Sequence, residues 1–338
     1  MSRTCVLIPG DGIGPEVCEA AVRVVEAAGA DLVWERHLAG SAALDAGETS
    51  VLPETTLQAI RSHRVALKGP CTTPIGGGFA SVNVALRKGL DLYAAVRPVR
   101  NLAGVESRFE GVDLVVIREN TEGLYSGIEN EVTAGVVTSL KVATVGACRR
   151  ISRFALDYAR ARGRRKVTVL HKANIMKLTD GLFLDCAREV FADSGVAYEE
   201  RIIDAGCMQL VRDPTVFDVL LCENLYGDVV SDLCAGLVGG LGVTPGANFG
   251  ESCAVFEAVH GSAPDIAGRD LANPLAVVMS AVMLLNHLAE SEGDGRYRTS
   301  ATRIRNAYDA ALRAGERTRD VGGQLGTRAF TEALLARL

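Results

Sequence analysis

The stretch CVLIPGDGIGPEVCEAAVRVVEAA, residues 5–28, contains one complete repeating unit of the fold. Its first four residues, Cys5–Ile8, are all apolar, which is typical of a buried strand, and the turn residues after them end that strand. Small and apolar side chains then recur at helical spacing over Pro15–Ala28, which predicts a helix with one buried face. A strand followed directly by a helix indicates an α/β sheet.

The same alternation continues along the chain. Further buried strands are predicted at Val65–Leu67, Leu114–Ile117, Val167–Leu170 and Val219–Cys222. Functional groups of open α/β sheets gather beyond the carboxyl ends of the strands. We therefore expect functional side chains in the segments that follow these strands: Lys68–Pro70, Arg118–Asn120, His171–Asn174 and Glu223–Asn224.

Composition excludes several classes of protein. A length of 338 residues favours about two domains at roughly 150 residues each. The charge of −5 argues against a nucleic-acid partner, and 48% hydrophobic residues exclude disorder. The longest apolar stretch, Leu275–Leu285, is about half a membrane span, so no membrane partner is expected. Nine cysteines, no two closer than twelve residues, favour a reducing compartment, and we expect a cytoplasmic protein.

The segment Tyr125–Gly146 differs from the rest of the chain. Its two runs Val132–Val137 and Leu140–Val145 are rich in β-branched residues and lie among Gly and Thr. This pattern predicts an antiparallel excursion from the α/β body. An arm for dimerisation and an ordinary surface hairpin both remain open on the pattern alone.

Two glycine-rich segments invite a search for phosphate or cofactor sites. Gly10–Gly14 resembles a dinucleotide fingerprint, but Pro15 and the early Gly14 break the spacing, so structural turn glycines are the better interpretation. Thr72–Gly78 leads into a helix whose N-terminus can bind an anion, and Ser81 is suited to cap that helix.

Three arginines are candidates for binding carboxylates. Arg87 lies four residues after Asn83, so both side chains share one face of the expected helix. Arg97 and Arg118 are each expected at the boundary of an element. Three guanidiniums together can clamp several carboxylates, whereas any one alone is more simply a surface ion pair.

A third group of residues fits a metal and proton transfer. Asp228 and Asp232 are spaced for one helix face, which suits Mg²⁺ or Mn²⁺, although helix-start acids are the commoner alternative. Asp204 is a further candidate ligand. Lys172 and Tyr125 are candidate proton acceptor and donor, although each residue type is more often structural. His260 has no second histidine nearby, so it is not expected to bind metal.

Seven ordered motifs together resemble the isocitrate and isopropylmalate dehydrogenase family, the β-decarboxylating dehydrogenases. The motifs are LIPGDGIGPEV at 7–17, KGPCTTPIGGG at 68–78, SVNVALRKGLDLYAAVRPVR at 81–100, RENTEGLYSGIE at 118–129, HKANIMK at 171–177, ENLYGDVVSDL at 223–233 and FEAVHGSAPDIAG at 256–268. The resemblance implies a non-Rossmann, three-layer α/β/α fold. It further implies a large domain of 1–95 plus 239–338 and a small domain of 96–238, with a dimer clasp at 123–146.

The resemblance also implies a reaction. Family members oxidise the 2-hydroxyl of a 3-substituted malate with NAD(P)⁺ and then release the 3-carboxylate as CO₂. By similarity, Arg87, Arg97 and Arg118 hold the substrate, and Asp228 binds Mg²⁺ or Mn²⁺ with support from Asp232. The other implied roles cross between two chains: the partner subunit's Asp204 completes the metal site, the partner subunit's Lys172 takes the hydroxyl proton, and Tyr125 returns a proton to C3. A homodimer or higher oligomer is therefore expected.

Two pairs of residues narrow the choice of substrate and the choice of cofactor. Ser81 and Asn83 are hydrogen-bonding groups like those of isocitrate dehydrogenases, which favours isocitrate. A phosphonate-bearing analogue, homoisocitrate, 3-isopropylmalate and tartrate stay open. Asp265-Ile266 stands where NADP-dependent isocitrate enzymes carry Lys-Tyr, and an aspartate there favours NAD⁺. Further expected cofactor contacts are Thr73, Asn174, Glu257, His260 and Asn273.

A different class of function is a non-catalytic regulatory subunit of a hetero-oligomeric isocitrate dehydrogenase. Such a subunit would lack the base, the acid or the metal-binding carboxylates. All of these residues are present here, so an enzyme is expected.

Overall fold

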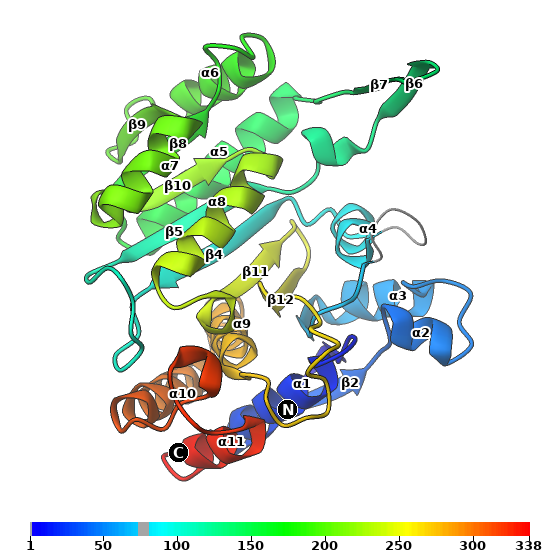
Figure 1. Cartoon of the computed structure of the whole chain (residues 1–338), viewed down its shortest axis with the longest axis vertical. Helices are drawn as coiled ribbons and strands as arrows, with labels where there is room; N and C mark the ends of the chain where they lie inside the picture. Colours follow the sequence, from blue (N-terminus) through cyan, green and yellow to red (C-terminus); the bar gives the residue numbers. More distant parts are fainter. Residues whose placement is uncertain (1, 74–80) are drawn as a thin grey trace.

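A computed structural model describes residues 2–73 and 81–338 (Figure 1). It contains a ten-stranded mixed sheet with helices on both faces and a separate two-stranded hairpin. The predicted α/β fold class is therefore confirmed. The strands of the large sheet are β1 Arg3–Ile8, β2 Leu32–Arg36, β3 Val65–Lys68, β4 Ala94–Arg100, β5 Asp113–Glu119, β8 Lys166–His171, β9 Ala197–Ile202, β10 Val219–Cys222, β11 Pro245–Phe249 and β12 Ala254–Ala258.

The large sheet consists of two parallel halves that run in opposite directions. Its strand order is β2-β1-β3-β12-β11-β4-β5-β10-β8-β9. Strands β4 and β11 are antiparallel to both of their neighbours, and they join the half that contains β3 to the half that contains β5. The carboxyl ends of β1, β3 and β12 therefore lie at the opposite end of the sheet from those of β5, β8 and β10. Three successive antiparallel pairs, β12–β11, β11–β4 and β4–β5, reverse the direction of the sheet between its halves.

Alternating side chains along the strands bury both faces of the sheet. In β5, Val115 and Ile117 face one layer of helices, while Leu114 and Val116 face the other. The layer that Val115 and Ile117 face contains α5 and α6 over the half of the sheet with β5, and α1, α9, α10 and α11 over the half with β3. The opposite layer contains α7 and α8 over the half with β5, and α3 and α4 over the half with β3. The helices are α1 Gly14–Ala27, α2 Ser41–Asp45, α3 Glu54–His63, α4 Val82–Gly89, α5 Val145–Ala161, α6 Thr179–Phe191, α7 Ile203–Arg212, α8 Asn224–Leu237, α9 Leu275–Ser291, α10 Gly295–Arg313 and α11 Thr327–Leu335.

Four hydrophobic clusters follow the expected division into two domains. Two clusters draw almost entirely on residues 1–95 and 239–338, and two draw almost entirely on 96–238. Both chain termini lie in the first part (Figure 1). The boundary at residue 95 falls inside β4, so the sheet itself continues across it. This distribution supports the partition, which we propose as the domain organisation.

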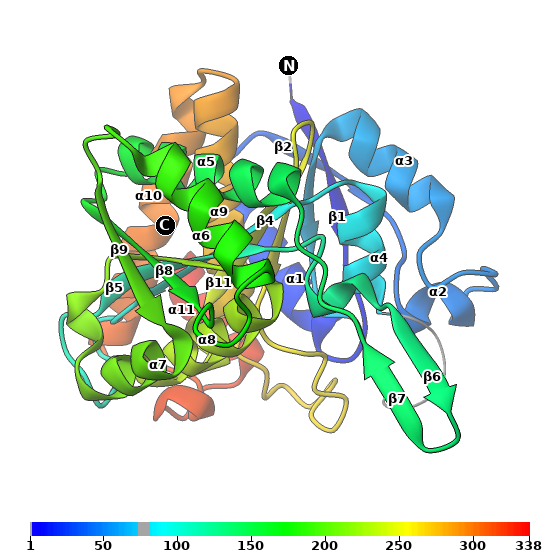
Figure 2. The same cartoon turned by 90° about the horizontal axis from the view of Figure 1, so that it is seen from above.

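The hairpin projects away from the body of the molecule (Figure 2). It is formed by β6 (Glu129–Thr133) and β7 (Val136–Ser139), and every residue of both strands is exposed. The antiparallel excursion is thus confirmed, but the expected strands are misplaced. The run Val132–Val137 contains the turn, where Gly135 has φ of +80°, and Leu140–Val145 leads into α5. Because β-branched residues lie on both sides of the turn glycine, the sequence pattern does not show where the turn separates the two strands.

The first glycine segment is structural, as the broken fingerprint spacing indicates. Gly10 has φ of +76°, and a Cβ there would lie 2.1 Å from the carbonyl oxygen of Pro70. The Asp11 carboxylate accepts a hydrogen bond from the backbone N–H of Thr72 at 2.8 Å. The loop therefore ties β1 to the segment after β3. The second glycine segment was expected at Thr72–Gly78, and its residues 74–78 lie outside the described residues.

The apolar run near residue 280 belongs to the core. Leu275–Leu285 lies within α9, where nearly every side chain is buried. Within residues 2–73 and 81–338, no helix has both the length and the apolar character that crossing a bilayer requires.

Candidate functional site

Arg118 lies at the centre of a charged cluster between β5 and α8. It is 1% exposed, and its guanidinium donates to Asp228 Oδ1 and to Asn224 Oδ1, the latter at 2.7 and 3.0 Å. Gly227 permits this approach, because a Cβ there would lie 2.6 Å from the Arg118 side chain. Glu223 begins α8 by accepting backbone N–H groups, which fixes the helix against the strand end.

Arg97 approaches the same helix from the middle of β4. The expectation that it stands at the boundary of an element is wrong, because β4 extends three residues to each side of it. Strand alternation directs its side chain toward α8, where it donates to Ser231 Oγ and, at 3.3 Å, to Asp232 Oδ1. Burial, together with the nearby Arg118 and Arg87, lowers the pKa of Arg97 to about 10.

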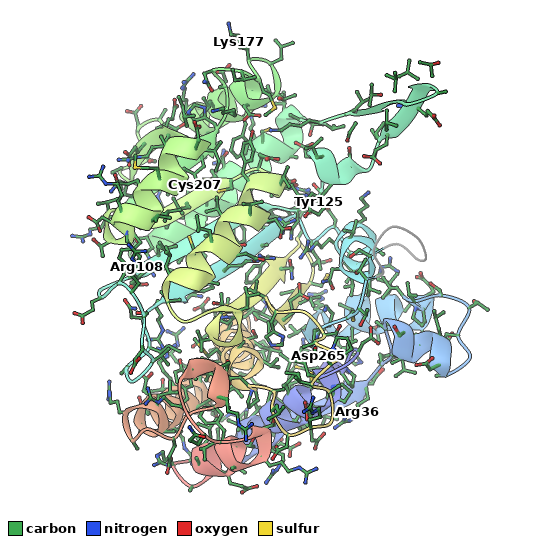
Figure 3. All side chains as sticks on the ribbon, in the orientation of Figure 1. Arg36, Arg108, Tyr125, Lys177, Cys207 and Asp265 are labelled. Carbon is green, nitrogen blue, oxygen red and sulfur yellow. The ribbon has the colours of Figure 1, made fainter. Side chains whose placement is uncertain are left out.

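Tyr125 completes the cluster at the base of the hairpin (Figure 3). Its hydroxyl donates to Asp228 Oδ2 at 2.5 Å, and the Arg118 guanidinium lies 4.9 Å from its ring centroid. Burial and the Asp228 carboxylate raise the pKa of Tyr125, so the phenol keeps its proton near neutral pH.

The two carboxylates of α8 differ in charge environment. Burial acts to raise the pKa of Asp228, but Arg118 and the Tyr125 hydroxyl outweigh it and hold this pKa below the usual value. Burial dominates at Asp232 and raises its pKa, against the influence of Arg97. The structure therefore brings five of the predicted site residues into one cluster: Arg97, Arg118, Tyr125, Asp228 and Asp232.

A polar cavity of about 100 Å³ adjoins this cluster and is lined by Asn83, Arg87 and Arg97. Ser81 caps α4 by accepting the Val84 N–H at 3.5 Å, as expected. Asn83 and Arg87 share one face of α4, also as expected. Asn83 Oδ1 and Arg87 Nε are buried without a hydrogen-bond partner among the described residues, so this wall presents unsatisfied polar atoms.

A buried ion pair forms another wall of the cavity. Lys68 Nζ lies 2.7 Å from Glu257 Oε2, and Asn248 donates to Glu257 Oε1 at 2.8 Å. Burial opposes ionisation of Glu257, but Lys68 and Arg87 overcome it and lower its pKa to about 2. The position of Lys68 at the end of a predicted strand marked it as a functional candidate, but the sequence assigned it no role. The strand-end argument missed Asn248, because β11 is an antiparallel strand with no recognisable helix after it.

Lys172 and Asp204 lie apart from this cluster and pair with each other. Lys172 Nζ donates to Asp204 Oδ1 at 2.7 Å, and the Asp204 side chain is 70% exposed. Lys172 follows β8 directly, whereas Asp204 lies in the first turn of α7. Among the described residues no group of three His, Cys, Asp or Glu side chains is placed to hold a metal ion. One chain therefore does not bring Asp204 to Asp228.

Among the expected cofactor residues, Glu257 and His260 line the cavity, whereas Thr73, Asn174, Asp265, Ile266 and Asn273 do not. His260 lines the cavity, and its Nε2 has no partner in the described part of the chain. The Asn273 side chain serves the fold, because it accepts the Leu275 N–H at 2.9 Å and donates to Asp320 at 3.0 Å. Thr73 and Asn174 are exposed.

Asp265 and Ile266 occupy the loop after β12. The Asp265 side chain is exposed and makes no side-chain hydrogen bond within residues 2–73 and 81–338 (Figure 3). Ile266 packs against the core. The Asp265 carboxylate is thus available to a ligand, whereas the Ile266 side chain stabilises the loop.

Comparisons with known proteins agree with this arrangement. The family model described as isocitrate/isopropylmalate dehydrogenase matches residues 4–334. The chain is 50% identical over 334 residues to isocitrate dehydrogenase [NAD] catalytic subunit 5, mitochondrial, of Arabidopsis thaliana, covering 98% of this chain and 87% of that protein. It is 52% identical over 284 residues to the chloroplastic 3-isopropylmalate dehydrogenase of Solanum tuberosum, covering 83% and 79%.

A solved structure extends the likeness to the whole fold. The crystal structure of isocitrate dehydrogenase from Methylococcus capsulatus superimposes with a TM-score of 0.94 at 46% identity, covering 99% of both chains. Family model, relatives and fold therefore agree. The chain belongs to the isocitrate/isopropylmalate dehydrogenase family, whose members are β-decarboxylating dehydrogenases that use NAD(P) and a divalent metal.

Proposed function

We propose that this protein catalyses the oxidative decarboxylation of isocitrate to 2-oxoglutarate and CO₂, with NAD⁺ as oxidant and Mg²⁺ or Mn²⁺ as cofactor. One observation carries the proposal: the guanidiniums of Arg87 and Arg97 line a small polar cavity, and the Arg118 guanidinium shares the Asp228 carboxylate with Arg97. The same chemistry on 3-isopropylmalate is the second candidate, because the Solanum tuberosum relative is named for that substrate.

The positive charge of the cluster favours a ligand with several carboxylates. Asp228 and Asp232 neutralise two of the three guanidiniums, and Glu257 is shared between Lys68 and Arg87. The lowered pKa of Arg97 reflects burial first and then repulsion by Arg118 and Arg87. An anionic ligand relieves this repulsion, and guanidiniums bind carboxylates through two parallel hydrogen bonds.

Asn83 supports a polar group on the third carbon of the substrate. Its amide oxygen is buried without a partner among the described residues, and a side-chain amide presents N–H donors after rotation. The apolar branch of 3-isopropylmalate would leave this amide unpaired, which weakens binding, whereas the third carboxylate of isocitrate accepts a hydrogen bond from it.

The carboxylates of α8 fit a divalent cation. Asp228 and Asp232 lie on one helix face, their side chains are 35% and 55% exposed, and the lowered pKa of Asp228 keeps that group ionised. Hard oxygen donors of this kind suit Mg²⁺ or Mn²⁺. When bound, the cation supplies a Lewis acid next to the substrate oxygens, and NAD⁺ supplies a hydride acceptor.

Two side chains are assigned the proton transfers. Tyr125 is protonated and hydrogen-bonded to Asp228, so it is poised to deliver a proton to C3 after CO₂ leaves. Lys172 takes the proton from the substrate hydroxyl. Within one chain Lys172 faces Asp204 rather than the arginine cluster, so we assign this step to the partner subunit's Lys172.

The surface supports assembly into a homodimer. Apolar side chains are exposed on neighbouring helices α7 and α8, where Met208 is 49% and Val229 is 59% exposed. Val132 and Val137 of the hairpin are 66% and 67% exposed. Covering these apolar side chains with a second copy removes them from water, and it brings the partner subunit's Lys172 and Asp204 toward the cluster.

A panel of substrates tests the proposal. NADH formation is measured with isocitrate, 3-isopropylmalate, homoisocitrate, tartrate and a phosphonate analogue of isocitrate, each with Mg²⁺ or Mn²⁺. The highest kcat/KM is expected for isocitrate, and a preference for 3-isopropylmalate would refute the substrate assignment. Asn83→Leu should lower kcat/KM for isocitrate by about 10- to 100-fold relative to 3-isopropylmalate, because it removes the hydrogen-bonding group.

The choice of NAD⁺ has its own test. The free carboxylate of Asp265 is suited to accept hydrogen bonds from ribose hydroxyls and repels a 2′-phosphate. Asp265→Lys should shift the NAD⁺/NADP⁺ ratio of kcat/KM toward NADP⁺ by about tenfold, since a repulsive charge becomes an attractive one. An unchanged ratio would remove Asp265 from the cofactor site. Glu110→Lys, at an exposed carboxylate outside this loop, is the charge control.

A non-catalytic regulatory role is disfavoured by the assembled cluster. Tyr125, Asp228 and Arg118 are in mutual contact, an arrangement that a subunit without catalytic function does not need. Purified protein with no turnover on any substrate of the panel would favour that alternative.

All nine cysteines are free thiols, which supports our proposal of a reducing compartment such as the cytoplasm.

A further inference from the structure

A large cavity lies on the face of the sheet opposite the arginine cluster. It has a volume of about 660 Å³ and is bounded by α5 on one side and by α9 and α10 on the other. We call it the rear cavity. It shares no lining residue with the polar cavity next to Arg97. Its volume is sufficient for a drug-sized ligand.

Three strands connect the rear cavity to the candidate active site. Val96, Phe249 and Phe256 line the rear cavity. Their neighbours along the same strands, Arg97, Asn248 and Glu257, line the polar cavity. Successive side chains of a strand point to opposite faces, so a shift of β4, β11 or β12 moves both sets together.

Aromatic side chains are concentrated in the rear cavity. The chain has only 17 aromatic residues, and five of them line this one cavity: Tyr93, Phe154, Tyr158, Phe249 and Phe256. Phe154 connects two others, with ring centroids 5.9 Å from Tyr93 and 5.6 Å from Phe249. Such a lining favours a flat aromatic ligand through ring stacking.

Charged groups at the rim indicate which end of the ligand is anionic. Arg305 on α10 and Arg153 on α5 line the cavity, are exposed and have no carboxylate partner in the described part of the chain. By contrast, Glu290 binds Arg162 at 2.6 Å and Asp91 binds Arg150 at 2.6 Å.

Two carboxylates that have no partner in the described part of the chain also line the cavity. Asp157 and Glu251 line the cavity and lie near Tyr93, whose pKa is raised by burial and by these two acids against the opposing effect of Arg150. They offer hydrogen-bond acceptors rather than an anion site. Asp157 lies one turn from Arg153 on α5, so the anionic group is assigned to Arg305 on α10, and an N–H donor on the ring is assigned to Asp157 and Glu251.

We propose that the rear cavity is a regulatory site for a flat aromatic anion. The ring stacks among Phe154, Tyr158 and Phe249, and the anionic group pairs with Arg305. A ligand bound in the rear cavity holds α5 at a fixed distance from α9 and α10. Through β4, β11 and β12 it shifts the side chains of the same strands that line the candidate active site. The proposed catalytic reaction neither requires nor uses this site.

Fluorescence of 8-anilino-1-naphthalenesulfonate, an aromatic anion with an N–H group, tests binding on the whole protein. Saturable enhancement is expected, and neither NAD⁺ nor isocitrate should displace the probe. Arg305→Glu should weaken binding about tenfold through charge repulsion, whereas Arg313→Glu, on the same helix outside the cavity, should not. Absence of saturable binding, displacement by NAD⁺, or equal effects of the two variants would overturn the proposal.

A neutral ring compound separates the role of the anion from that of the apolar lining. N-phenyl-1-naphthylamine has the same rings without the sulfonate, and its binding should be insensitive to Arg305→Glu. If Arg305→Glu weakens both compounds equally, the substitution disturbs the cavity itself, and the assignment of an anion site is wrong.

The regulatory effect is measured separately. Saturating probe should change KM for the substrate at least twofold in the native protein and not in Arg305→Glu. An unchanged KM would contradict the regulatory role. This measurement rests on the proposed function, whereas the fluorescence titration uses no substrate turnover. Failure of the catalytic proposal is therefore distinguishable from failure of the rear-cavity proposal.

Discussion

Two lysine–carboxylate pairs in this molecule have the same length and very different surroundings. Lys68–Glu257 and Lys172–Asp204 both have an N···O distance of 2.7 Å. The first pair is 2% and 12% exposed, and the second is 26% and 70% exposed. Distance alone therefore does not tell what an ion pair does. Burial makes the first pair part of the fold, and exposure leaves the second able to exchange partners.

The buried pair holds its charges through its neighbours. Glu257 accepts from Asn248 as well as from Lys68, and its pKa falls to about 2 despite burial. Lys68 also donates to the Gly69 carbonyl. The exposed pair has no comparable support, because Asp204 is open to water and only Lys172 and nearby backbone groups lower its pKa. We infer that Lys172 changes partner when a second subunit and a substrate are present.

The largest expected effect is a loss of catalytic activity when Lys172 of the exposed pair is replaced. Lys172→Met should lower kcat about 10³-fold, because it removes the proposed proton acceptor. Asp228→Asn should lower activity through the metal site and raise the metal concentration needed. Unfolding and refolding the two inactive variants together should restore about a quarter of the native activity, because half of the dimers are mixed and each mixed dimer has one intact site.

This mixing experiment identifies a site shared between chains. Each variant refolded alone is the control, and both should stay inactive and dimeric by light scattering. If the mixture is as inactive as its components, Lys172 and Asp228 act within one chain, and the assignment of Lys172 to the partner is wrong.

A smaller effect, on stability rather than proton transfer, is expected from the buried pair. Glu257→Gln leaves the Lys68 ammonium buried without its counter-charge and should lower the free energy of unfolding by about 3–5 kcal/mol. Asp204→Asn should leave the urea midpoint unchanged, because Asp204 is open to water. Urea denaturation of the two variants side by side makes the comparison, and equal midpoints would contradict the distinction between the pairs.

The sequence predicts one of these pairs better than the other for a topological reason. Lys172 directly follows β8, and Arg118 is the second-last residue of β5 in the same parallel half, so the strand-end argument places both near a functional edge. Glu257 lies in β12, in the half that runs the opposite way, and only family resemblance drew attention to it. Asn248 was missed entirely. Antiparallel strands such as β4 and β11 lack the strand-then-helix signature, although they carry Arg97 and Asn248 across the middle of the sheet.

Local patterns are reliable where local chemistry decides the structure. Ser81 caps its helix because its hydroxyl lies beside a free backbone N–H group of the first helical turn. Gly10 makes its turn because glycine adopts a positive φ without steric strain. Both effects act over only a few residues. The hairpin strands were misplaced because β-branched residues favour strand on both sides of Gly135. The separation of Lys172 from Asp228 depends on tertiary and quaternary structure, which spacing along the chain does not encode.

The smallest expected effect is a difference between the two pairs in how their contribution to the free energy of unfolding depends on pH. The pKa of Glu257 falls from 4.5 to about 2 on folding, so its contribution to stability is complete above pH 4.5 and is lost as the pH falls toward 2. The gap in unfolding free energy between the native protein and Glu257→Gln should therefore narrow between pH 6 and pH 3. Asp204 also has a lowered pKa, but water screens its charge, so Asp204→Asn should show no gap at either pH. Urea titrations at the two pH values measure both gaps. A gap for Glu257→Gln that stays constant would mean that lost packing, rather than lost charge, destabilises this variant.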